Sequence, residues 1–521
     1  MSEFLEELDK VVPDNLDNKV VSLLAPTEEL EEEIEPLKTM GQLKAMVTLR
    51  GERWRADSQH QKEKNGTVAI HMPSVSQIAE ELMDVCHFVL IGKGKSDRSP
   101  LYLYNPETGL YTDSDDLIDS LIYAFDSRID VNTYNKVKHI IRIKSKLKEP
   151  LNDKNLLAVG NGILNRKTKE LLPFSPNLII TSKIKTAYNP RAILPTFGGK
   201  FIFTDWLKEI ACNDDEIITL LWQVMNETIN PLQTRGKMVI LTGSGNNGKG
   251  TFQDLLKNLV GEGNYSTLRP DQFKGFELGS LVGKVCNIGD DIENGFLPEV
   301  SNLKSITSGD TVTINEKYGR IYEAELKLLC IFSANEIPRT KDKTNGWYRR
   351  LCIIPFDANF NGTKENKAIK QVYLKDNQLL EWLLFQIIDM EPFDKFIEPK
   401  RVTAQLKEYK KDNDIFQAFV EDFYMPRNWH ECRNVPIWLI TEHLTEYLAE
   451  NEITTQKGIK NVGGNMIRVL EEITDNEYKK TKRKVIKADY PILYHDPKNP
   501  NDYPSKFGQS NHSIVKVTRG D

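Results

Sequence analysis

A glycine-rich segment that follows an apolar run is the part of the sequence best suited to bind an anion. The run Met238-Val-Ile-Leu241 leads into this segment, and an amphipathic stretch follows it. Glycines let consecutive backbone N–H groups turn toward one ligand, the next helix directs its positive end at that ligand, and a lysine can reach the outer phosphates. The pattern predicts a nucleotide-binding loop made of Gly243, Ser244, Gly245, Asn246, Asn247, Gly248, Lys249, Gly250 and Thr251. A strand-to-helix turn without a ligand is the alternative.

The residues after Lys249 depart from the usual phosphate-loop pattern. That pattern places a serine or threonine directly after the lysine as a magnesium ligand, whereas here Gly250 comes first and Thr251 second. We therefore expect Mg²⁺ at this loop and take Thr251 as its provisional ligand.

Two adjacent carboxylates follow the next apolar run. Residues 284–289 end in Asp290 and Asp291, which places both acids beside the predicted loop if the run is a strand. One carboxylate of such a pair can hold Mg²⁺ while the other polarises the attacking water. We predict that Asp290 binds the metal and that Asp291 polarises the attacking water. Glu293 is the alternative residue for the second role. An ordinary acidic turn is the alternative.

A predicted hairpin carries two cations and an aromatic ring at its tip. Residues 311–316 and 321–326 can pair as strands, and the tip between them is Lys317-Tyr-Gly-Arg320. Lysine and arginine contact phosphates, and Tyr318 can stack on a base or sugar. The tip is therefore predicted to contact a nucleic-acid strand, although a solvated turn has the same composition.

Two further sites suit a nucleotide hydrolase. Asn335 ends the apolar run 328–334, where an amide can orient the water or sense the γ-phosphate. Arg349 and Arg350 precede the apolar run 351–356, and an arginine there can reach a neighbouring subunit's nucleotide and neutralise charge on its γ-phosphate. A strand-terminating asparagine and a surface ion pair are the respective alternatives.

Strand-like and helical patterns alternate through the centre of the chain. Apolar runs at 285–289, 326–333 and 351–356 predict an α/β nucleotide-binding domain, and 204–229 has helical spacing. Before them, strand pairs are predicted around turns at 105–109 and 165–169. The predicted divisions are an acidic, partly flexible segment (1–66) with a polar linker at 57–66, an α+β domain (67–195), the nucleotide domain (196–398) and a C-terminal domain (399–521).

The C-terminal domain combines two helical patterns with a basic strand. Residues 436–448 and 465–473 are amphipathic, and the basic stretch 478–487 follows them. This order predicts a small winged-helix-like unit whose Lys482, Arg483 and Lys484 contact DNA phosphates. A solvated basic strand is the alternative. A second basic run at 136–148 either guides DNA or forms the solvent-exposed face of a helix.

Composition narrows the class of protein. The chain has 521 residues, 39% of them hydrophobic, and lacks an apolar run near the ~20 residues of a membrane span. Its acidic start lacks the features of a secretion signal, so we expect an intracellular, cytoplasmic protein without a membrane partner. Six cysteines without a C-x-x-C pair indicate neither a zinc module nor a disulfide framework. The net charge of −6 is uneven, with acid near the N-terminus and base in two later clusters.

The order and spacing of these motifs resemble superfamily 3 DNA helicases, the AAA+-type hexameric motors of small viruses, phages and plasmids. The sequence is most similar to the poxvirus-type primase-helicase family of phages, plasmids and mobile genomic islands, over about 70–356. The flanking stretches 155–174 and 184–190 are similar to the domain that precedes the motor in that family.

The resemblance implies a role for each motif. It implies an AAA+-like P-loop motor in which Lys249 binds phosphates, Asp290 and Asp291 serve the Walker B role, and Lys317 lies on a pore hairpin. Asn335 matches the sensor 1 position, and Arg350, or Arg349, matches the arginine finger. No segment of the sequence indicates a primase centre.

The resemblance also implies an activity. We expect an ATP- and Mg²⁺-dependent DNA helicase that initiates replication of a mobile element in a bacterial host. It would be a homo-hexamer with one DNA strand in the ring and origin duplex on the C-terminal domain. Two alternatives stay open: an origin-binding initiator that uses ATP as a switch and recruits a separate helicase, and a small-molecule P-loop kinase, for which neither an acceptor pocket nor a lid is evident.

Overall fold

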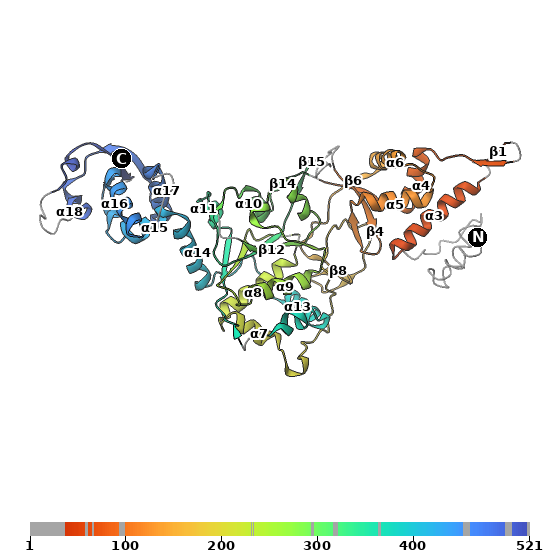
Figure 1. Ribbon diagram of the computed structural model, residues 1–521, viewed down its shortest axis with the longest axis horizontal. Helices are drawn as coiled ribbons and strands as arrows, with labels where there is room; N and C mark the ends of the chain where they lie inside the picture. Colours follow the sequence, from red (N-terminus) through yellow and green to blue (C-terminus); the bar gives the residue numbers. More distant parts are fainter. Residues whose placement is uncertain are drawn as a thin grey trace.

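The computed structural model describes residues 37–57, 61–64, 67–92, 99–230, 232, 234–292, 296–315, 321–362, 366–451, 459–494 and 503–517. Within these residues, an N-terminal and a C-terminal group of elements lie at opposite ends of a central α/β body (Figure 1). Each end group has its own apolar core, and two large cores cover the faces of the central sheet. The mixed α/β class expected from the sequence is confirmed.

The N-terminal group packs helices against a small sheet with the strand order β5-β4-β3-β6. Strands β4 and β5 pair antiparallel around residues 105–109, where the Asn105 side chain accepts a hydrogen bond from the Glu107 N–H at 2.9 Å. The predicted hairpin is therefore confirmed. The elements are α3 (Met40–Ala56), α4 (Val75–Val85), β3 (Phe88–Ile91), β4 (Leu101–Asn105), β5 (Leu110–Thr112), α5 (Asp115–Phe125), α6 (Val131–Lys144) and β6 (Lys146–Lys148).

The stretch expected to be a linker contains a strand. Strand β1 (Gln61–Lys64) pairs antiparallel with β2 (Thr67–Ile70). Every residue of β1 is polar, so the stretch lacks the apolar alternation that marks a half-buried strand in a sequence. The acidic residues at 28–35 lie outside the described residues.

The central sheet has five parallel strands in the order β11-β12-β16-β10-β18. Strands β10, β16 and β18 are buried along their whole length, which explains why each is a continuous apolar run rather than an alternating pattern. All three strand predictions fall in this sheet. Its strands are β10 (Met238–Thr242), β11 (Tyr265–Ser266), β12 (Cys286–Ile292), β16 (Leu329–Ala334) and β18 (Leu351–Pro355).

Helices cover both faces of the sheet, because alternate residues of each strand point to opposite sides. One core joins Val239 and Leu241 to α8, α9 and α13, and the other joins Met238 and Ile240 to α10 and α14 (Lys400–Asn413). The first core also takes in the hairpin formed by β7 and β8. The elements are β7 (Leu156–Val159), β8 (Gly162–Asn165), β9 (Leu171–Leu172), α7 (Phe203–Ile210), α8 (Asp215–Thr228), α9 (Lys249–Val260), α10 (Ser301–Ser308), α12 (Lys367–Gln371) and α13 (Asn377–Asp389).

The helical pattern at 204–229 forms two helices, α7 and α8. The chain breaks after α7 at Cys212 and Asn213, which adopt positive φ angles of 55° and 58°. Asp214 then caps α8 by accepting hydrogen bonds from the Glu216 and Ile217 N–H groups. Asparagine tolerates the left-handed region and aspartate favours the N-cap, which explains why the chain can turn at these residues.

The hairpin predicted at 311–326 is confirmed, although its tip lies outside the described residues. Strands β14 (Thr311–Asn315) and β15 (Ile321–Glu325) pair antiparallel from Thr311 opposite Glu325 to Asn315 opposite Ile321. Residues 316–320, including Lys317 and Tyr318, are not described. Short pairs elsewhere in the body are β13 (Phe296–Leu297) and β17 (Arg339–Thr340).

The C-terminal group contains both predicted helices and the predicted basic strand. Its three-stranded sheet has the order β19-β21-β20, so β20 is an edge strand, and the core buries Leu444 of α16 and Met466 of α17. The elements are α15 (Ile415–Phe419), β19 (Asn434–Pro436), α16 (Ile437–Glu450), α17 (Val462–Thr474), β20 (Tyr478–Arg483), α18 (Tyr490–Leu493) and β21 (Asn511–Lys516).

Helix α14 (Lys400–Asn413) joins the C-terminal group to the central body through buried polar contacts. Asn413 donates to the Tyr348 hydroxyl at 3.0 Å, and its Oδ1 accepts from the Thr340 N–H at 2.7 Å. The next residue, Asp414, is 1% exposed and pairs with Arg468 of α17. The junction therefore ties α17 to α11 (Asn345–Tyr348) of the central body through two consecutive residues.

Candidate functional site

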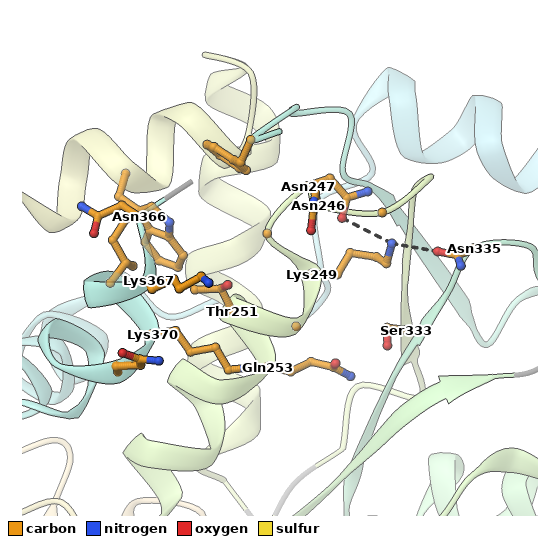
Figure 2. Close-up of a pocket in the computed structure, with 17 residues that line it drawn as sticks. Asn246, Asn247, Lys249, Thr251, Gln253, Ser333, Asn335, Asn366, Lys367 and Lys370 are labelled. Atoms are coloured by element: carbon orange, nitrogen blue, oxygen red, sulfur yellow. Dashed lines mark hydrogen bonds between the residues drawn. The ribbon is translucent and has the colours of Figure 1, made fainter. Parts of the chain in front are cut away.

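The glycine-rich loop connects the carboxyl end of β10 to the first turn of α9. Lys249 is the first residue of α9 and is only 6% exposed. Its Nζ donates to Asn247 Oδ1 and to Asn335 Oδ1, both at 3.3 Å (Figure 2). It also donates to the Gly243 carbonyl at 2.5 Å. Because β10 and β16 are parallel neighbours, Asn335 follows β16 at the same edge of the sheet. The fold thus brings Lys249 and Asn335 together, as their order in the sequence predicted.

Close packing fixes the shape of this loop. A Cβ on Gly243 would lie 2.0 Å from Asn247 Nδ2 and 2.3 Å from the Phe356 carbonyl oxygen. Asn247 is 2% exposed and donates to that same carbonyl at 2.9 Å, which ties the loop to the end of β18. Gly248 has a φ of 92° at the N-cap of α9, a conformation open to glycine.

Replacing Gly243 with alanine should therefore lower the free energy of unfolding by about 1–3 kcal/mol, the usual cost of forcing extra atoms into a packed site. Gly250→Ala is the matched control, because a Cβ there meets nothing within 4 Å and α9 would gain up to about 1 kcal/mol of helix propensity. Urea unfolding measures both. Equal stability of the two variants would contradict the packing argument.

A cavity of about 590 Å³ opens above the loop, a volume within the usual range for ligand sites. Lys249 and Thr251 line it from α9, Ser333 lines it from β16, and Asn335 lines it from just after that strand. Figure 2 shows Asn366, Lys367 and Lys370 on the wall opposite Asn335. The remaining lining residues are Gly245, Asn246, Asn247, Gly248, Gly250, Gln253, Trp206, Phe360, Ile369 and Gln371.

The backbone of Asp290 and Asp291 lies within the last residues of β12, one strand beyond β16 from the loop. A register irregularity separates Ile288 from Asp291, which pairs with Ser333 near the carboxyl edge. The two acids thus belong to the strand itself rather than to the turn after it. Nothing is described of their side chains, and Glu293 lies outside the described residues.

Gln253 links the loop helix to this acidic strand and was not foreseen. It is 3% exposed, and its Nε2 donates to the Gly289 carbonyl, directly before Asp290, at 2.8 Å. The signal available in the sequence was a polar residue between Phe252 and Leu255 on the apolar face of α9. The α12 wall was also missed, because no pattern in that short helix indicates a ligand.

The described residues contain no cluster of three or more His, Cys, Asp or Glu side chains that could hold a metal by themselves. A nucleotide-bound Mg²⁺ does not require one, since phosphates and waters supply most of its ligands. Thr251 and Ser333 both line the cavity, so hydroxyl oxygens that such an ion can use are present there.

Arg349 and Arg350 lie at the opposite edge of the sheet from the loop. Both arginines precede β18, whose five residues pair in parallel register with β10. The arginines therefore lie at the start of these strands and the loop at their end, a strand length of roughly 16 Å apart. Arg350 is engaged within the chain: it donates to Ser308 Oγ at 2.6 Å and to the Lys304 carbonyl at 3.2 Å. Burial, and then the charge of Arg349, lower the pKa of Arg350. The Arg349 side chain is exposed.

The basic residues at the two ends of the chain differ in their surroundings. Lys482 and Lys484 are exposed and Arg483 is half-buried, at the end of the edge strand β20. In the basic run of α6, by contrast, Lys138 pairs with Asp119 at 2.9 Å and Lys144 pairs with Glu80. These pairs favour the structural interpretation of that run. Among the described residues, none of the helices has the length and hydropathy of a membrane span.

Two family models match parts of the chain. The model described as "D5 N terminal like" matches residues 41–212, and the model described as "Family of unknown function (DUF5906)" matches residues 241–350. A solved structure of the NrS-1 C-terminal region, in its apo A form, covers 86% of this chain and 100% of its own, at 12% identity and a TM-score of 0.45.

Viral proteins named as helicases are similar to part of the chain. "Putative helicase L207/L206" of Acanthamoeba polyphaga mimivirus is 27% identical over 45% of this chain and 27% of its own length. "Putative helicase 022R" of Frog virus 3 (isolate Goorha) is 25% identical over 35% of this chain and 21% of its own length. The chain thus spans about a quarter of these relatives. The D5 N-terminal-like segment and the similarity to viral helicases support a relationship of this chain to the D5-type primase-helicases.

Proposed function

We propose that this chain is an ATP-dependent DNA helicase of the AAA+-type superfamily 3, which initiates replication of a mobile element in a bacterial host. The observation that carries the proposal is the Lys249 ammonium, almost fully buried at the head of a cavity and bonded to both the loop and Asn335. The similarity to viral helicases supports the class of activity.

The chemistry follows from the elements that meet at the loop. The backbone N–H groups at the start of α9 and the Lys249 ammonium would bind the phosphates of ATP. Thr251 and Asp290 would hold Mg²⁺, which neutralises charge on the phosphates when bound. Asp291 would polarise the attacking water, and Asn335, beside Lys249, would orient it toward the γ-phosphate.

Assembly would supply the remaining cation. An arginine at the amino edge of the sheet is too far from its own loop to act there, so it would serve the nucleotide of the next subunit in a homo-hexamer. Of the two candidates, Arg349 is the better placed, because Arg350 already bonds to Ser308 and Lys304.

DNA would contact two parts of the chain. Lys317 and Tyr318, at the tip of the β14–β15 hairpin, would hold one strand inside the ring. The exposed cations at the end of β20 would bind phosphates of origin duplex through a winged-helix-like C-terminal domain, which the order of helices and strands there supports.

A strand-displacement assay on a forked duplex tests the proposal. We expect separation only with ATP and Mg²⁺. Lys317→Ala should slow unwinding about tenfold, the effect of losing one contact of ~1–3 kcal/mol, while ATP hydrolysis stays within about twofold of wild type.

Lys341→Ala is the control for the loss of one exposed lysine, because Lys341 is not part of the β14–β15 hairpin. Normal unwinding by Lys317→Ala would refute the role of the hairpin. DNA binding that depends on ATP but never leads to strand separation would favour an initiator that recruits a separate helicase.

A further inference from the structure

A short helix forms the second wall of the nucleotide cavity. Helix α12 is fixed against α9 by the ion pair between Lys370 and Asp254 at 2.6 Å. The Asn258 side chain of α9 also donates to the Leu374 carbonyl at 2.9 Å, just beyond α12. The wall is therefore held at a defined distance from the loop before any ligand binds.

Lys367 differs from Lys370 although both lie on one face of α12, three residues apart. Lys370 is paired with Asp254, whereas Lys367 has no ion-pair partner among the residues that the structure describes. Lys367 is exposed, lines the cavity and lies beside Thr251, on the wall opposite Asn335 (Figure 2). An ammonium that faces a ligand cavity and has no ion-pair partner among the described residues is suited to bind an anion.

Lys249 and Lys367 lie on different sides of the cavity. Lys249 and Asn335 meet on one side, and Lys367 lies on the opposite wall beside Thr251 (Figure 2). A nucleotide has its outermost phosphate at one end and its nucleoside at the other. With the outermost phosphate at Lys249 and Asn335, the α12 wall would face the part of the nucleotide nearer the nucleoside.

We infer that Lys367 binds the phosphate nearest the nucleoside, while Lys249 and Asn335 bind the outer phosphates. This inference rests on the proposed ATP site and deepens it. It assigns the α12 wall to the part of the ligand that ATP and ADP share. Lys367 would thus hold the nucleotide before and after hydrolysis and would not distinguish the two.

Calorimetric titration of the full chain with Mg-ATP and with Mg-ADP tests this assignment. Lys367→Ala should weaken both nucleotides by about tenfold, equivalent to about 1.4 kcal/mol, and leave the ratio of their Kd values unchanged. Lys367→Arg should restore most of the affinity. Asn335→Ala, at the other end of the cavity, should change the ratio by weakening ATP more than ADP.

Lys375→Ala is the control for loss of a nearby charge, because Lys375 is exposed and does not line the cavity. The inference fails if Lys367→Ala behaves like Lys375→Ala, or if it weakens ATP and spares ADP. Failure of the proposed function looks different: the wild-type chain would then bind neither nucleotide, or Lys249→Ala would bind both as tightly as wild type.

Discussion

Lys249→Ala is expected to lower the rate of ATP hydrolysis by a factor of about 10²–10³, the usual effect of removing a preorganised group that stabilises developing charge. The ammonium lies 2.5 Å from the Gly243 carbonyl and 3.3 Å from Asn335 Oδ1, and Lys249 is only 6% exposed. Its loss removes a positive charge from beside the phosphates and takes a donor from the Gly243 carbonyl, Asn247 Oδ1 and Asn335 Oδ1. Phosphate release with saturating ATP measures the effect.

Lys208→Ala controls for the loss of one lysine near the site, because Lys208 of α7 is exposed and is not among the residues that line the cavity. Thermal unfolding of both variants separates a loss of chemistry from a loss of structure. If a folded Lys249→Ala protein hydrolysed ATP at the wild-type rate, the proposal that this loop binds the nucleotide would be wrong.

Arg349→Ala is expected to bind ATP normally and to hydrolyse it about 10³-fold more slowly, as when an arginine finger is removed. The reason is its position: Arg349 is exposed at the end of α11, across the sheet from its own loop. Arg350→Ala should instead lower the thermal stability of the protein, because it would lose the hydrogen bonds to Ser308 and to the Lys304 carbonyl. Nucleotide titration, phosphate release and thermal unfolding of the two variants distinguish these outcomes.

Mixing two inactive proteins gives a sharper test. Where a subunit with Lys249→Ala stands beside one with Arg349→Ala, some interfaces join an intact Lys249 to an intact Arg349, so hydrolysis should reappear. If mixing restores nothing, or if a stable Arg350→Ala protein loses hydrolysis while Arg349→Ala keeps it, the assignment to Arg349 is wrong.

The central sheet could be predicted from the sequence because parallel strands are buried on both faces. Strands β16 and β18 are therefore continuous apolar runs, and the sequence around them places Asn335 at the carboxyl edge and Arg349 at the amino edge. The loop could also be predicted, because packing permits only glycine at some of its positions. At Gly243, for example, there is no space for a Cβ.

Other features left no such pattern. The break between α7 and α8 depends on two residues with positive φ, and apolar spacing continues on both sides of it. The α12 wall depends on tertiary packing against Asp254, more than a hundred positions earlier in the chain. The contrast between Arg349 and Arg350 depends on Ser308, which no local motif connects to them.

The junction at Asn413 and Asp414 has a thermodynamic consequence. Asn413 bonds to Tyr348, the residue before Arg349, and Asp414 bonds to Arg468 of the C-terminal group. Linkage between two sites is reciprocal. If a ligand on the C-terminal group shifts α17 and, through it, α11, the coupling free energy must act equally in both directions. An event at the neighbour's nucleotide would then alter the affinity of the C-terminal group by the same factor.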